Sequence, residues 1–126
     1  MKIAIGIAIA GFLGAVARYG AGFLFPYDAG STGFPWATLF INLSGSFLLG
    51  SLTGWLMRRN DLAWLGEVFG TGFLGSFTTF SAFNGQMWQL WEHHAYAQAM
   101  SYLLLSAVGG WLLAMVGLRW GRGKPL

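Results

Sequence analysis

Hydrogen-bonding side chains recur at helical spacing inside apolar stretches of this chain. Thr38, Asn42 and Ser46 are each four residues apart and therefore share one face of a helix. A second stripe with the same spacing consists of Gln98, Tyr102 and Ser106. Burying such groups in an apolar medium is costly unless they find partners. Each stripe is therefore either a contact between packed helices or a polar track for a dehydrated ion, and the spacing leaves both open.

The segment 70–83 is rich in Gly, Thr and Ser, although it lies within an apolar stretch. Such a composition makes a poor continuous helix. Backbone that leaves the helix inside a membrane needs protein or a polar cavity to take up its hydrogen bonds. Freed carbonyls around Gly75 to Thr78 would suit a cation, and freed amides and hydroxyls an anion. The alternative is a straight helix whose Ser and Thr bond back to their own carbonyls.

Two phenyl rings and one cation complete the set of candidate residues. Phe80 and Phe83 are three residues apart and face the same way on a helix. The edge of a phenyl ring is positive, so two edges beside a narrow path would attract a small anion weakly, although lipid or core contact is the default. Arg18 either reaches the membrane interface or supplies positive potential at a pore mouth.

The elements that position these residues are predicted to be four membrane-spanning helices in a single domain over residues 1–126. Charged residues make up 9% of the chain and apolar residues 56%, whereas soluble domains carry roughly 25% charged residues. A bilayer is crossed by about 20 apolar residues, and the predicted spans are 3–25, 36–57, 68–91 and 95–118. The fold class is therefore an all-α, multi-pass protein of the cell membrane, plasma or inner.

Charges mark the ends of the spans. Six of the seven Lys and Arg lie on the side that holds both termini and the middle loop, and Arg18 lies towards the other side. This bias predicts cytoplasmic termini. Residues 1–17 also fit a signal peptide that ends at Ala15-Val16-Ala17, but we expect them to be retained as the first span.

Several function classes are disfavoured by what the sequence lacks. There is no Cys, and the Lys and Arg form no patch for nucleic acid. No nucleophile, base and orienting group can be assembled, so an enzyme is not expected. His93 and His94 are adjacent and would diverge on a helix, which makes a poor metal pair. A proton-coupled exporter needs an acid buried in the membrane, whereas all four acids lie at span ends or in loops: Asp28, Asp61, Glu67 and Glu92.

Three motifs in order, one in each of the first three spans, resemble the fluoride-specific ion channel family, Fluc, also called CrcB-like. They are GFLGAVARY at residues 11–19, PWATLFINLSGSFLLG at 35–50 and GFLGSFTTFSAF at 72–83. The third motif is highly specific. The resemblance implies a passive channel that exports cytoplasmic fluoride and so lowers its toxicity. It also implies a third helix broken in mid-membrane and a dimer of antiparallel subunits in the lipid bilayer, with two fluoride pathways.

The same resemblance assigns roles to residues of this chain. A structural sodium ion at the dimer centre is implied, held by the carbonyls of Gly75 and Thr78. The fluoride pathway is implied to include the following residues: Arg18, Asn42, Thr79, Phe80, Ser81, Phe83, Tyr102 and Ser106. Donor groups must replace the hydration shell of fluoride there, while weak phenyl edges let the ion move on.

The chain departs from the family pattern at four positions: Ala37, Ser76, Ala82 and Gln86. Ser76 stands in the implied sodium loop, and Ala82 removes a hydroxyl beside the phenyls. An antiparallel homodimer requires one sequence to insert both ways, which usually goes with a weak Lys/Arg bias, whereas the bias here is strong. A heterodimer with an oppositely biased homologue is therefore an alternative to the expected homodimer. Two further functions compete with that of a self-sufficient channel, namely a non-conducting partner subunit and a small-molecule exporter.

Overall fold

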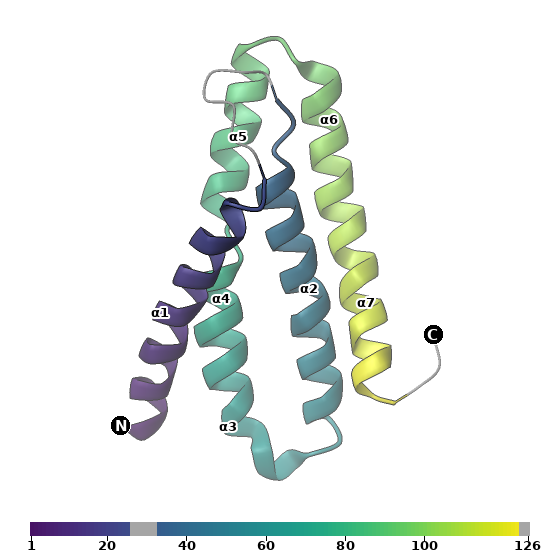
Figure 1. Ribbon diagram of the computed structural model, residues 1–126. Helices are drawn as coiled ribbons and strands as arrows, with labels where there is room; N and C mark the ends of the chain where they lie inside the picture. The colour runs from purple at the N-terminus through teal and green to yellow at the C-terminus, as the bar shows by residue number, and fades with distance from the viewer. Residues whose placement is uncertain (26–32, 124–126) are drawn as a thin grey trace.

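The computed structural model describes residues 1–25 and 33–123, all of whose regular elements are helical (Figure 1). The first two helices are α1 (Lys2–Gly22) and α2 (Trp36–Leu56). The next stretch contains η1 (Asn60–Leu62), α3 (Ala63–Leu65), the π-helical η2 (Gly66–Leu74), α4 (Gly75–Phe77) and α5 (Phe80–Glu92). The last contains α6 (Tyr96–Leu104), the π-helical η3 (Leu105–Gly109) and α7 (Gly110–Gly121).

Within residues 1–25 and 33–123, three helices are long and apolar enough to cross a membrane: α1, α2 and the continuous helix Tyr96–Gly121, with mean hydropathies of 1.7, 1.3 and 1.8. This all-helical membrane architecture agrees with the predicted class. The predicted third span, 68–91, is divided among η2, α4 and α5. Asp28 and Lys124, on which parts of the loop and charge predictions depend, lie outside the described residues.

Helices α2 and α7 lie side by side and run in the same direction (Figure 1). Glycines allow their backbones to touch. A Cβ at Gly50 would overlap the carbonyl of Ala114, and one at Gly117 would overlap the carbonyl of Phe47. The same close approach occurs one turn on, at Gly54 and Gly121. Small residues four apart are how membrane helices pack closely.

We therefore expect Gly117→Ala to destabilise the chain, because the methyl group cannot enter without separating α2 from α7. Overpacking of this kind costs about 1–3 kcal/mol. The midpoint of thermal unfolding in detergent should fall relative to Gly20→Ala, since a Cβ at Gly20 meets nothing within 4 Å. Equal midpoints for the two variants would contradict this packing.

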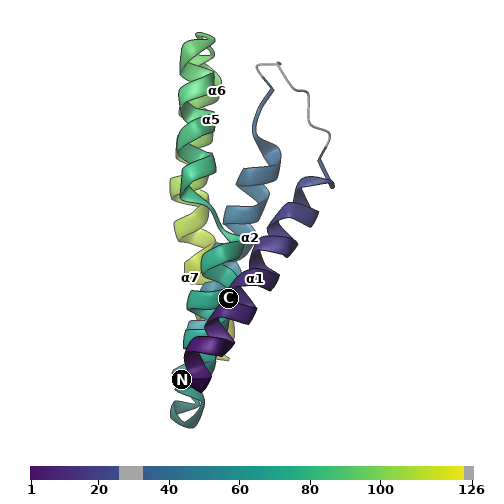
Figure 2. The same cartoon turned by 90° about the vertical axis from the view of Figure 1, so that its left-hand side faces the viewer.

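Helix α1 packs against η2 and α4. Gly14 lies against the backbone of Phe73, and Gly72 lies against the backbone of Ile7. Helix α1 continues without interruption across residues 17 and 18. Towards its C-terminal end α1 diverges from α5, as Figure 2 shows. The elements are therefore tightly packed at one end and open at the other.

Candidate functional site

The chain leaves the helix at two consecutive threonines between α4 and α5. Thr78 and Thr79 are extended, with ψ of 159° and 120°. The Thr78 hydroxyl donates to the carbonyl of Leu74 at 3.0 Å. Thr79 is the N-cap of α5, and its hydroxyl accepts from the amide of Ala82 at 3.2 Å. The Thr-Thr pair therefore caps both flanking helices.

Asn42 of α2 binds the backbone of this junction with both ends of its amide. Its Nδ2 donates to the carbonyl of Thr79 at 3.0 Å, and its Oδ1 accepts from the amide of Thr79 at 2.8 Å. One turn on, Gly45 leaves room for the methyl group of Thr78, which a Cβ would overlap. For Asn42 the interhelical contact is therefore realised. Ser46 instead bonds back within α2, to the carbonyl of Asn42 at 2.9 Å.

The carbonyls of Gly75 and Thr78 are among those that lose their helical donors at the junction. In a continuous helix Gly75 would accept from Thr79, and Thr78 from Ala82. Here those amides bond to Asn42 Oδ1 and to the Thr79 hydroxyl. Ser76, which departs from the family pattern, stays within helical α4, and its hydroxyl lies where Gly11 of α1 leaves space.

An aromatic row runs beside the junction. The rings of Phe80 and Phe83 are nearly parallel, 20° apart with centroids at 5.9 Å, and Phe83 lies 4.9 Å from the ring of Tyr102 on α6. Phe80 is 75% exposed, whereas Tyr102 is fully buried. The Tyr102 hydroxyl donates to Oε1 of Gln86 at 2.9 Å. This bond ties α6 to α5.

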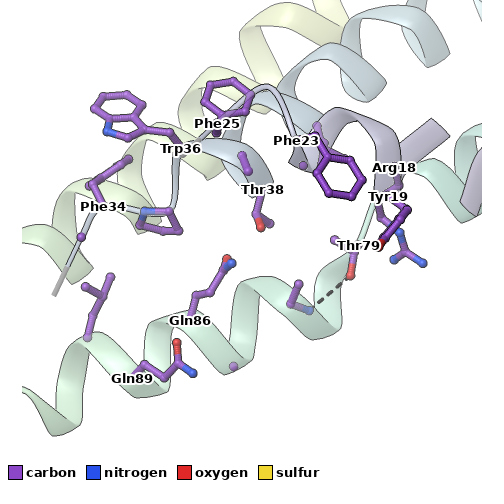
Figure 3. Close-up of a pocket in the computed structure, with 18 of the residues that line it drawn as sticks. Arg18, Tyr19, Phe23, Phe25, Phe34, Trp36, Thr38, Thr79, Gln86 and Gln89 are labelled. Atoms are coloured by element: carbon purple, nitrogen blue, oxygen red, sulfur yellow. Dashed lines mark hydrogen bonds between the residues drawn. The ribbon is translucent and has the colours of Figure 1, made fainter. Parts of the chain in front are cut away.

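A cavity of about 1120 Å³ opens where α1 diverges from α5. Figure 3 shows Thr38 of α2 opposite Gln86 of α5, with Arg18 and Tyr19 of α1 near Thr79. Most of the lining is apolar or aromatic. Its hydrogen-bonding and charged side chains include Arg18, Thr38, Thr79, Gln86, Gln89 and His93.

The candidate residues fall into distinct groups. Asn42, Thr79 and Ser81 are adjacent, with the Ser81 hydroxyl 3.2 Å from that of Thr79. Phe80, Phe83 and Tyr102 form the aromatic row, and Arg18 lines the cavity. Ser106 lies in η3, and its hydroxyl is buried with no hydrogen-bond partner among the described residues. π-helical turns of this kind are rare overall, but many of those known lie at functional sites.

Several polar residues of the cavity were not among the predicted site residues, including Thr38, Gln86, Gln89 and His93. Three of them could have been found from the sequence. Residues 79, 82, 86, 89 and 93 are small or polar and lie three or four positions apart, so they share one face of a helix. In the sequence, Gln86 is notable only because it departs from the family pattern. That departure does not indicate what the side chain contacts.

A family model described as "CrcB-like protein, Camphor Resistance (CrcB)" matches residues 5–118. "Fluoride-specific ion channel FluC 2" of Geobacillus kaustophilus is 41% identical over 90% of this chain and 88% of its own length. "Fluoride-specific ion channel FluC 1" of Bacillus cereus (strain ATCC 10987) is 43% identical, over 91% and 84%. "Fluoride-specific ion channel FluC" of Bordetella petrii is 38% identical, over 90% and 87%.

Proposed function

This chain belongs to the CrcB-like family, and from that membership we propose that it is a passive, fluoride-selective channel of the cell membrane. The family predicted from the three motifs is thereby confirmed. Fluoride leaves the cytoplasm down its electrochemical gradient, because an inside-negative potential favours anion exit by ~2.3 kcal/mol per 100 mV. The observation that carries the proposal is the interrupted α4–α5 junction, held by Asn42 beside the parallel rings of Phe80 and Phe83.

The hydrogen bonds support different roles for the residues along the fluoride pathway. The Asn42 amide donates a hydrogen bond to the carbonyl of Thr79, and the Tyr102 hydroxyl donates one to Gln86, so both side chains hold the geometry of the pathway as well as line it. An anion needs a hydroxyl that is free to donate, and the Ser106 hydroxyl has no hydrogen-bond partner among the described residues. Arg18 raises the positive potential of the cavity, and the phenyl edges bind the ion weakly enough to release it.

We propose that two antiparallel subunits build the conducting unit. One chain supplies a single wall, and Phe80 is 75% exposed on it, which leaves a pathway residue for a second subunit to cover. The pathway then lies between chains, and the interruption of the third span lies in mid-membrane. A homodimer remains our expectation over a heterodimer. Topology tags on both termini test this, since a single orientation in cells that express only this chain would require a partner of opposite orientation.

A sodium ion at the dimer centre is part of the same proposal. The carbonyls of Gly75 and Thr78 lack their helical donors, and uncharged carbonyl oxygens suit a hard monovalent cation. These two oxygens of one copy, together with the same two of an antiparallel partner, would hold the ion. Fluoride efflux that persists unchanged after sodium is replaced by N-methylglucamine throughout purification would count against this site.

Purified protein alone in liposomes should release fluoride when valinomycin is added to dissipate the opposing potential. Chloride-loaded vesicles are the control and should release nothing above protein-free vesicles. Fluoride efflux without valinomycin would indicate coupled exchange instead of a passive channel. Well-folded protein that releases no fluoride would favour a subunit that conducts only with a partner.

A further inference from the structure

One face of α5 lines the cavity from the N-cap of the helix to its C-cap. The lining positions include, in order, Thr79, Ala82, Gln86, Gln89 and His93. They span about 20 Å along the helix at 1.5 Å per residue. Thr79 is the inner end, near Arg18 (Figure 3). His93 is the outer end, where α5 turns towards α6.

The two adjacent histidines have different surroundings. His94 has a left-handed φ of 58°, and its Nδ1 lies 2.9 Å from the hydroxyl of Tyr96, outside the set of residues that line the cavity. His93 lines the cavity, and its Nδ1 lies 2.8 Å from the carbonyl of Gln89. Because a carbonyl only accepts, Nδ1 of His93 carries a hydrogen, which leaves Nε2 to take a second proton.

Few other charges face this imidazole among the described residues. Helix α1 contributes Arg18 and Tyr19 to the cavity, whereas the lining residues of α2 and of the segment 33–35 are uncharged. On its own side, Glu92 precedes His93 and His94 follows it. Among the described residues, the lining therefore carries one permanent cation at its inner end and one imidazole at its outer end that becomes cationic on protonation.

We propose that His93 is a second anion-attracting residue of the fluoride pathway, one that recruits fluoride to the cavity mouth when its imidazole is protonated. This rests on the proposed channel function. Histidine changes charge between pH 5 and 8. One unit charge at 5–10 Å in a water-filled mouth raises the local concentration of a monovalent anion about two- to fourfold. Gln89 and Gln86 then lie between the mouth and Thr79.

The test is fluoride efflux from liposomes at equal inner and outer pH, from 8 to 6, at low ionic strength and limiting fluoride. Protein-free vesicles are subtracted because neutral hydrogen fluoride leaks faster in acid. The natural chain should conduct faster at pH 6 than at pH 8, by at most about two- to fourfold. His93→Gln should stay at the slow rate, and His93→Arg should stay at the fast rate. His94→Gln is the matched control and should keep the natural pH dependence.

Raising the concentration of an inert salt to 0.5 M should flatten the natural profile, because exposed charges are then screened within a few ångströms. The proposal is overturned if His93→Gln titrates like the natural chain, if His94→Gln is the variant that loses the dependence, or if His93→Arg remains pH-dependent. Gel filtration establishes that each variant is folded. A natural chain that releases no fluoride at any pH would contradict the channel function itself, which is a separate result.

Discussion

Asn42→Leu abolishes fluoride efflux and lowers the free energy of unfolding, because it removes both hydrogen bonds to the backbone of Thr79. Leaving a part-buried amide and carbonyl without partners costs about 1–3 kcal/mol each. Without these two hydrogen bonds, the amide of Thr79 is free to donate to the carbonyl of Gly75 as in a continuous helix, which would move Phe80 and Phe83. Unfolding in detergent and efflux from liposomes measure the two effects.

Asn42→Asp separates the two hydrogen bonds. A carboxylate still accepts from the amide of Thr79 but cannot donate to its carbonyl, and burying its charge is costly, so Asn42→Asp should be less stable than the natural chain. Ser46→Ala is the matched control on the same helix face, since that hydroxyl bonds only within α2. If Asn42→Leu unfolded at the same denaturant concentration as Ser46→Ala, the two hydrogen bonds between Asn42 and Thr79 would not contribute to the free energy of unfolding.

Phe80→Ile reduces fluoride efflux to the rate of protein-free vesicles without unfolding the protein. The change removes the positive ring edge but costs little stability, because the side chain is three-quarters exposed on the single chain. Phe83→Ile should also stop efflux and should in addition lower the unfolding midpoint, since Phe83 packs against the cluster of Leu39, Leu90 and Tyr102.

Phe12→Ile supplies the control for these variants, because Phe12 is an exposed phenyl on α1. Its efflux should equal that of the natural chain. Rapid fluoride efflux through Phe80→Ile would place the pathway elsewhere in the molecule, whatever its stability.

Features that depend on local sequence were predictable. The apolar stretches and their punctuation predicted where α1, α2 and the last helix lie, because length and hydropathy decide membrane spans. The run of Gly, Ser and Thr favoured a weak helix near Gly75 to Thr78; Gly75–Phe77 is helical, and the extended residues are Thr78 and Thr79.

Features that depend on how helices meet were not predictable. Asn42 and Thr79 are 37 residues apart, and their pairing depends on the rotation of α2 relative to the junction. The bond between Tyr102 and Gln86 likewise depends on how α6 packs against α5. The helical spacing of the cavity-lining positions on α5 was visible in the sequence. The divergence of α1, which turns those positions into the wall of a cavity, has no local signal.

The parallel pairing of α2 and α7 has a consequence for the charge bias. Two helices that run the same way end at the same edge of the molecule, and each C-terminus carries roughly half a negative elementary charge from its aligned peptide dipoles. Arg58, Arg119 and Arg122 lie at that edge, with Arg122 also donating to the sulfur of Met57 at 2.9 Å. Part of the positive charge therefore offsets the two macrodipoles, whichever way the chain inserts. A lopsided count of Lys and Arg is then less of an obstacle to a homodimer of opposed subunits than the count implies.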